Sequence, residues 1–188
     1  CDSAGNNGTT LGAYRSSDAG ATWTSVPVGS FQQTYGWYLC AIGVSPSNQD
    51  TAIFAGYDLL RTTNAGSSFS TVTTQHVDNH ALAWDASGRL WAGCDGGLFR
   101  SSNNGTSWTN MNTGLGLVQF YAGVSISPSD PTLVLGGLQD NGSCQHVGAS
   151  QTWSNFVGGD GGYTAIDQLL PSREFAQFQG SGNIYRST

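Results

Sequence analysis

Four carboxylates and a short histidine-rich run are the side chains of this 188-residue sequence that could do chemistry. Paired carboxylates can act as general acid and base and hydrolyse a glycosidic bond. The alternative is structural, because Asp and Asn are good turn formers beside glycine, as in Asp95-Gly96. The sequence therefore offers a set of ligand-binding candidates without assigning a catalytic residue: Asp58, His76, Asp78, His80, Asp95, Asp140 and Asp160.

The histidine-rich run places His76, Asp78 and His80 at alternate positions. In an extended segment the three side chains would share one side, and imidazole and carboxylate both ligate zinc. Successive same-side Cβ atoms lie roughly 6.6 Å apart, so two ligands could reach one ion but three would need a bend. We therefore expect no metal and no cofactor here, and expect hydrogen bonds to neighbouring loops instead.

Aromatic residues near these candidates could stack on sugar rings: Tyr35, Trp37, Tyr38 and Tyr57. For Trp37 and Tyr38, packing into a core is an equally good alternative.

The composition predicts a folded, mostly β protein. The chain has 27 Gly, a single Glu and no Lys, whereas helix surfaces are built from Glu, Lys, Ala, Leu and Met. Hydrophobic residues at 38% supply a sizeable core. The net charge of -6 repels phosphate backbones, so nucleic acid is not expected as a partner. No apolar run approaches the roughly 18 residues of a membrane span, so no membrane is expected either.

A ten-residue pattern recurs along the chain, at Tyr14–Trp23, Leu60–Phe69 and Phe99–Trp108. A worn copy ends at Trp153, and residues 185–188 open a fifth. The closing aromatic residues are 46, 39 and 45 positions apart. That period is the length of one four-stranded propeller blade.

The repeats resemble the Asp-box, or bacterial neuraminidase repeat, S-x-D-x-G-x-T-W, of sialidase-like, sortilin-type and xyloglucanase-like β-propellers. Segments 76–85, 136–142 and 158–163 also resemble secreted bacterial Asp-box proteins, which are often labelled glycosyl hydrolases by similarity. The resemblance implies that each box is the hairpin between the third and fourth strands of a blade, opposite the ligand face. The Asp or Asn would accept backbone N–H bonds, the Gly would take the positive φ, and the Trp would pack into the blade.

The predicted fold class is therefore all-β, a β-propeller of four-stranded antiparallel blades, and by family analogy a segment of a larger, seven-bladed ring. Residues 1–188 form one propeller segment: a partial blade 1–30, blades 31–75, 76–115 and 116–157, and a partial blade 158–188. Turn residues and apolar runs predict strands at 12–16, 37–44, 51–56, 59–62, 68–72, 80–85, 89–93, 98–101, 107–110, 120–126, 132–136, 142–146, 151–155 and 184–188.

The chain enters and leaves in a third strand, which gives 17 strands and two open β edges. Open edges are templates for pairing, so flanking blades or neighbouring copies of the chain are expected to complete them.

In a propeller, the loops between second and third strands and the loops between blades lie on one face. Asp58, Asp95 and Asp140 fall in the former loops, and Asp160 and the histidine-rich run fall in the latter. We therefore expect all seven candidates to converge on one face.

A sialidase needs an arginine cluster for its substrate carboxylate and a Tyr nucleophile. Four of the six arginines precede boxes on third strands, and the other two lie near first-to-second-strand hairpins on the opposite face: Arg15, Arg61, Arg100 and Arg186, then Arg89 and Arg173. The sequence therefore predicts that this segment holds no sialidase site.

The four cysteines lack a C-x-x-C spacing, which favours disulfides and an extracellular location. We predict the pairs Cys1–Cys40 and Cys94–Cys144, because Cys1-Asp2 resembles Cys94-Asp95 at a strand end. Three N-x-S/T sequons are glycosylation candidates: Asn7, Asn104 and Asn141.

The leading hypothesis is a secreted Asp-box propeller that binds a glycan or an extracellular protein, without catalysis in this segment. One alternative is a xyloglucanase-like glycoside hydrolase that uses two of Asp58, Asp95, Asp140 and Asp160. The other is a structural subunit of an extracellular assembly.

Overall fold

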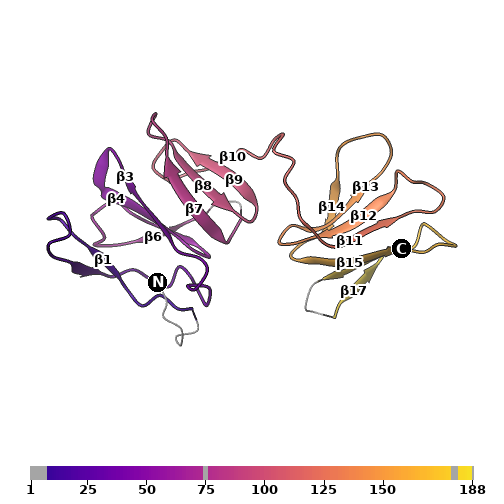
Figure 1. Cartoon of the computed structure of the whole chain (residues 1–188), viewed down its shortest axis with the longest axis horizontal. Coiled ribbons are helices and arrows are strands. Elements are labelled where there is room, and N and C mark those ends of the chain that lie inside the picture. Colours follow the sequence, from indigo (N-terminus) through magenta and orange to yellow (C-terminus); the bar gives the residue numbers. More distant parts are fainter. Residues whose placement is uncertain (1–7, 74–75, 179–181, 188) are drawn as a thin grey trace. The chain divides into compact units, whose positions relative to one another are not determined.

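The computed structural model describes residues 8–73, 76–178 and 182–187, and these residues are all β (Figure 1). They form seventeen antiparallel strands in five sheets of two, four, four, four and three strands. The predicted strand count is therefore confirmed for the described residues. These residues contain no helix that could cross a membrane. Cys1 and Asn7 lie outside them.

Each sheet is a meander in which every strand pairs with the next strand along the chain. This is the arrangement of propeller blades, so the predicted fold class is confirmed, and a partial propeller fits it. The strands are β1 (Ala13–Arg15) and β2 (Thr24–Val26); β3 (Ala41–Ser45), β4 (Asn48–Ala55), β5 (Leu59–Thr62) and β6 (Ser70–Val72); β7 (Asn79–Trp84), β8 (Leu90–Cys94), β9 (Gly97–Ser101) and β10 (Thr109–Asn110); β11 (Phe120–Ile126), β12 (Val134–Leu138), β13 (Gly142–His146) and β14 (Ser154–Val157); β15 (Gly161–Ile166), β16 (Glu174–Phe178) and β17 (Ile184–Arg186).

The chain forms two compact units, Cys1–Gly116 and Leu117–Thr188, called here the N-terminal and C-terminal units. In the N-terminal unit, β3 and β4 contact β7, so the second sheet packs on the third. The core between them is aliphatic and holds Ile53, Ala55, Leu59 and Leu90. In the C-terminal unit, β11, β12 and β13 contact β15 in the same way. Successive sheets within each unit therefore pack face to face.

Several strand boundaries differ from those predicted, and two of the shifts have a clear local cause. β3 begins at residue 41 rather than 37, because residues 35–39 form a turn in which the N–H groups of Tyr38 and Leu39 donate to the Tyr35 carbonyl at 2.9 and 2.7 Å. β12 spans 134–138 rather than 132–136. There Asp130 Oδ1 accepts the N–H of Thr132 at 2.9 Å and its hydroxyl at 2.6 Å, which holds Thr132 in a turn.

The first repeat folds into a closely hydrogen-bonded turn between β1 and β2. The Ser16 hydroxyl donates to Asp18 Oδ1 at 2.8 Å and accepts the N–H of Gly20 at 2.8 Å. Asp18 Oδ1 also accepts the N–H of Thr22 at 2.8 Å, and Asp18 Oδ2 accepts the Thr22 hydroxyl at 2.6 Å. Because these hydrogen bonds favour the carboxylate, chiefly the one from the Thr22 hydroxyl, they lower the pKa of Asp18 to about 2.

The second and third repeats fold into the same turn, with Asn in place of Asp. The amide oxygens of Asn64 and Asn103 accept the N–H groups of Ser68 and Ser107 at 3.0 and 2.9 Å. Their amide nitrogens donate to the hydroxyls of the same serines, both at 2.9 Å. The change from Asp to Asn therefore keeps the acceptor, as predicted, and reverses one hydrogen bond.

The closing aromatic residues pack less uniformly than predicted. Phe69 meets Phe54 edge-on at 5.2 Å, and Trp108 packs against the core around Leu90. Trp23 is 63% exposed, so the prediction that it packs into the blade is wrong. Its hairpin has only β1 and β2 within the described residues, and these leave the indole without a covering strand.

The predicted Cys94–Cys144 disulfide is wrong, because both cysteines are free. Each thiol lies within its own sheet, where Cys94 Sγ donates to the Gly97 carbonyl at 3.6 Å and Cys144 Sγ to the Gly136 carbonyl at 3.5 Å. Burial raises the pKa of Cys94 to about 11 and also raises that of Cys144. Cys40 is disulfide-bonded. Its pairing with Cys1 stays a prediction, since Cys1 lies outside the described residues.

Candidate functional site

The loops at one end of the N-terminal unit are joined by backbone hydrogen bonds. The N–H of Asp58 donates to the Phe31 carbonyl at 2.9 Å, and the N–H of Asp78 to the Tyr57 carbonyl at 3.3 Å. The N–H of Asp95 in turn donates to the Asp78 carbonyl at 3.3 Å. The loops β4–β5 and β8–β9 therefore lie beside the connections that precede β3 and β7. We call this surface the loop face.

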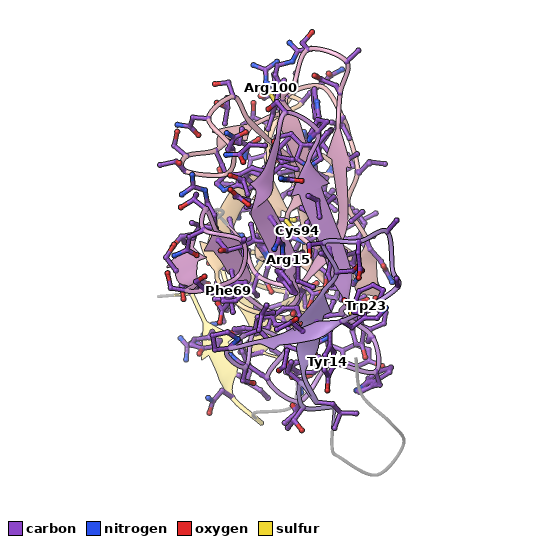
Figure 2. The ribbon with its side chains drawn as sticks, turned by 90° about the vertical axis from the view of Figure 1, so that its left-hand side faces the viewer. Tyr14, Arg15, Trp23, Phe69, Cys94 and Arg100 are labelled. Carbon is purple, nitrogen blue, oxygen red and sulfur yellow. The ribbon has the colours of Figure 1, made fainter. Side chains whose placement is uncertain are left out.

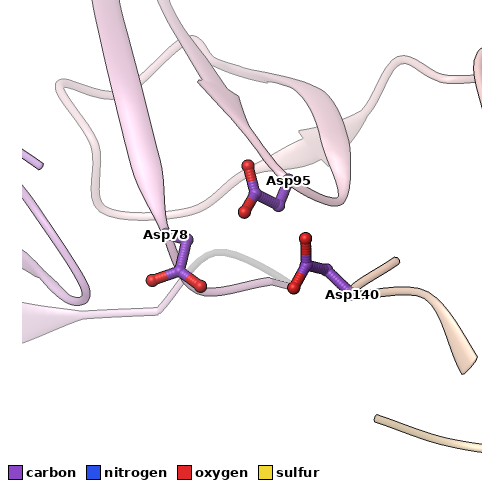
Figure 3. A group of neighbouring side chains, drawn as sticks. All are labelled: Asp78, Asp95 and Asp140. Carbon is purple, nitrogen blue, oxygen red and sulfur yellow. The ribbon is translucent and has the colours of Figure 1, made fainter. Parts of the chain in front are cut away.

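All the N-terminal candidates lie on the loop face: Asp58, His76, Asp78, His80 and Asp95. These five candidates therefore lie at one end of this unit, and the convergence of all seven stays a prediction. One carboxylate oxygen of Asp78 lies within 4.8 Å of one of Asp95. Figure 3 draws both carboxylates, together with Asp140, which belongs to the C-terminal unit.

The histidine-rich run is not extended. The prediction that its three side chains share one side assumed an extended segment. Asp78 has a φ of 58°, and β7 begins only at Asn79. His76 Nδ1 lies 3.0 Å from the Val77 carbonyl, whereas His80 Nε2 lies 2.7 Å from Asp95 Oδ1. The two imidazoles therefore have different partners, and only that of His80 belongs to a neighbouring loop.

A row of rings leads from solvent to the His80–Asp95 pair. Trp37 is 71% exposed and Tyr38 58% exposed, and their ring centroids are 5.4 Å apart. Tyr38 in turn meets the His80 ring at 4.8 Å, nearly at right angles. We call Trp37, Tyr38 and His80 the aromatic row. Since Trp37 and Tyr38 lie in the turn before β3, they project from the loop face rather than pack in a core.

A second pair of rings lies on the same face. Tyr35 and Tyr57 are stacked with centroids 6.3 Å apart and planes 13° apart. Tyr57 also lines a pocket of about 220 Å³ with Asp58, His76 and Asn79.

Sequence reasoning missed Asn79, which is 1% exposed. Its Nδ2 donates to the carbonyls of Gly56 and Tyr57 at 3.3 and 3.4 Å, and its Oδ1 has no hydrogen-bond partner among the described residues. A signal was present, because Asn79 and His80 are neighbours in a predicted strand region, where successive side chains point to opposite faces.

The C-terminal unit brings its own two candidates together. The N–H of Asp140 donates to Asp160 Oδ1 at 2.9 Å. Here the backbones approach closely, since a Cβ on Gly161 would lie 2.2 Å from the Gly142 carbonyl oxygen. The glycine-rich run is therefore required for packing. Asp160 serves this unit as a cap for the β12–β13 turn.

The arginines lie where the sequence placed them. Arg15, Arg61 and Arg100 are on third strands, and Arg61 Nε donates to the Asn104 carbonyl at 2.7 Å. Arg89 pairs with Asp85 at 2.7 Å, and Arg173 with Asp167 at 3.7 Å. Each pair lies at the first-to-second-strand hairpin of its own sheet, and within the N-terminal unit the Arg89 hairpin is at the other end of the strands from the loop face.

No protein-family model matches the chain, and no curated protein matches it either. Solved structures that are similar over most of the chain include two GH74 enzymes and a YCF48 protein. An ancestral GH74 enzyme has 15% identity and a TM-score of 0.43, with 97% of this chain and 29% of that chain covered. The GH74 xyloglucanase from Xanthomonas campestris has 16% identity and a TM-score of 0.43, covering 93% and 32%. YCF48 from Cyanidioschyzon merolae has 14% identity and a TM-score of 0.36, covering 93% and 62%.

The chain thus spans about a third of the length of the GH74 enzymes. At these identities and TM-scores the similarities assign no function to it.

Proposed function

We propose that this chain is a non-catalytic carbohydrate-binding segment of a secreted Asp-box propeller, which binds a neutral glycan on the loop face of its N-terminal unit. The exposed aromatic row beside the His80–Asp95 pair carries the proposal. Exposed large rings that are clustered rather than scattered mark binding surfaces. Trp37 and Tyr38 offer flat apolar faces, and the neighbouring carboxylate accepts hydrogen bonds from hydroxyl groups.

The charge of the chain supports a neutral ligand. A net charge of -6 disfavours acidic glycans. The described cations of the N-terminal unit are arginines on third strands or at hairpins, so they do not line the aromatic row.

The pairing of Asp95 with His80 supports binding over hydrolysis, because Asp95 Oδ1 is already engaged by His80 Nε2 at 2.7 Å. The alternatives are a xyloglucanase-like hydrolase, a propeller that binds an extracellular protein, and a structural subunit of an extracellular assembly.

The proposal is tested by replacing Trp37 with alanine and measuring binding to a panel of neutral polysaccharides by affinity electrophoresis. We expect at least a roughly tenfold loss of affinity, as for a central aromatic contact. Trp23→Ala is the matched control, since Trp23 is 63% exposed in a box turn away from the loop face.

Equal losses in both variants, or none in Trp37→Ala, would contradict the proposal. Reducing ends released by the wild type but not by Asp95→Asn would favour the hydrolase, and binding of proteins but no polysaccharide would favour the protein partner.

A further inference from the structure

The fourth repeat, in the turn between β13 and β14, lacks the two side chains that close the first repeat. His146 stands in the place of Ser16, and Gly148 stands in the place of Asp18. The alignment follows from strand pairing, because turns of equal length are enclosed by equivalent pairs of residues: Arg15–Thr24 in the first repeat and Gln145–Ser154 in the fourth.

His146 closes the fourth turn through both of its ring nitrogens. Nδ1 lies 2.8 Å from the carbonyl oxygen of Thr132, in the turn before β12. Nε2 contacts the carbonyl oxygen of Ser150, within the β13–β14 turn itself. A flipped ring would place C–H groups at these positions, but 2.8 Å is shorter than the roughly 3.3–3.6 Å of a C–H···O contact.

The imidazolium is the form of His146 that fits this turn. A carbonyl oxygen only accepts hydrogen bonds, so each of the two contacts requires a proton on the ring nitrogen. Neutral imidazole has one N–H and one lone pair, and the lone pair would face one of the carbonyl oxygens. The Trp153 ring also favours a positive charge, since its centroid lies 5.3 Å from that of His146, in range of a cation–π contact.

The charged groups around this turn are engaged by other partners. Asp130 Oδ1 accepts the hydroxyl of Thr132, and this hydrogen bond lowers the pKa of Asp130 below its ordinary value. Asp130 therefore stays ionised throughout the pH range in which histidine titrates. From the next sheet, Glu174 accepts a hydrogen bond from Gln145 Nε2 at 2.9 Å. No described carboxylate forms an ion pair with His146.

We propose that the β13–β14 turn is a pH-sensitive switch, closed by the His146 imidazolium and loosened when the ring loses a proton. The lone pair left by the proton repels the carbonyl oxygen that the nitrogen faced. The contact is therefore present in acid and is lost as the pH rises through the range in which imidazole titrates, around roughly pH 6.5. Loosening also frees Trp153 from His146, so that Trp153 keeps only its ring contact with Phe120, at 5.7 Å. The switch is independent of glycan binding on the loop face.

NMR of the 188-residue chain at about pH 5.5 and about pH 8 tests the switch. The N–H of Gly148 donates to Thr132 Oγ1 at 3.0 Å, so its protection from hydrogen exchange reports the closed turn. After correction for the intrinsic pH dependence of exchange, we expect roughly tenfold lower protection at the higher pH, the effect of losing a hydrogen bond to a charged group. Side-chain ¹⁵N shifts of His146 are expected to show both nitrogens protonated at the lower pH.

Two substitutions separate the charge of His146 from its shape. His146→Arg keeps N–H donors and a positive charge at every pH, so the protection of Gly148 is expected to stay high without a pH transition. His146→Gln carries no charge and is expected to give low protection at both pH values. His76→Gln is the matched control, because it removes a histidine of the N-terminal unit and is expected to leave the transition at Gly148 unchanged.

A transition that persists in His146→Gln would show that another group titrates, and the switch would be wrong. Equal protection of Gly148 in the wild type at both pH values, or a neutral His146 ring in the closed turn, would also overturn it. If a His146 variant does not fold, the wild-type titration and its His76→Gln control still decide the question.

Discussion

The first repeated turn has Asp18 at the position where the next two turns have Asn64 and Asn103. Asp18 presents two acceptors to Thr22, whereas Asn64 and Asn103 present one acceptor and one donor to a serine. A hydroxyl can donate or accept, so it completes the turn in either case. The chemical consequence is that only the turn with Asp can lose its hydrogen bonds in acid.

We predict that Asp18→Asn is nearly neutral at pH 7 and that its relative stability rises in acid. The pKa of Asp18 is lowered from 3.8 to about 2 in the fold. Its contribution is therefore complete above about pH 4 and is lost as the pH falls through about 2, whereas asparagine does not titrate. Thermal unfolding of both proteins between pH 7 and 2 measures this. A difference in Tm that does not depend on pH would contradict it.

At the scale of the elements, each repeated turn depends on a glycine with positive φ, 91° at Gly20 and 84° at Gly66. The surroundings of these two glycines differ. A Cβ on Gly66 would lie 2.7 Å from Cγ1 of Val26 on β2, whereas one on Gly20 would lie 3.8 Å from the nearest atom, in Trp23. The second turn thus packs against the first hairpin, and the first turn is open.

We predict that Gly66→Ala costs more stability than Gly20→Ala. Both pay backbone strain of about 1–2 kcal/mol, because alanine is unfavourable at positive φ. Gly66→Ala also collides with the stiff, branched Val26, which adds about 1–3 kcal/mol. Urea unfolding followed by tryptophan fluorescence compares the two. Equal losses would show that the second turn is not packed against β2.

At the scale of the whole molecule, the N-terminal unit exposes an apolar face beside its first hairpin. Ile42 and Val44 on β3 are 55% and 54% exposed. They line a groove of about 450 Å³ together with Tyr14, Trp23 and Phe69, and Figure 2 labels the last three. On the third sheet, the corresponding side chains of β7 pack against the second sheet. By the same arrangement, the exposed face of β3 would be covered if the sheet of β1 and β2 had two more strands beside β1.

We predict that the isolated 188-residue chain self-associates through this face, as the expectation of open edges suggests. Replacing Ile42 and Val44 with threonine keeps the β propensity and is expected to reduce association. Leu169→Thr is the control, because Leu169 is 89% exposed but lies in a loop of the C-terminal unit. Light scattering at increasing concentration decides it. A monomeric wild type that unfolds cooperatively would refute the expectation of incomplete edges.

The sequence by itself determined the strand count, the meander order and the repeated turn, because these depend on contacts between residues close in the chain. Ser16, Asp18 and Gly20 make their hydrogen bonds within one turn, so their spacing is sufficient to predict them. The order of the strands follows from the same turns.

Only the tertiary structure decided which side chains are covered, because the covering atoms come from distant segments. Trp23 and Trp108 occupy the same position in their repeats, yet only Trp108 meets a neighbouring sheet. The sequence predicted a disulfide for Cys94, whereas in the structure Cys94 is a free thiol beside the Gly97 carbonyl. Asn79 became a buried acceptor only because the Gly56 and Tyr57 carbonyls engage its other end, and these lie more than twenty residues away in the sequence.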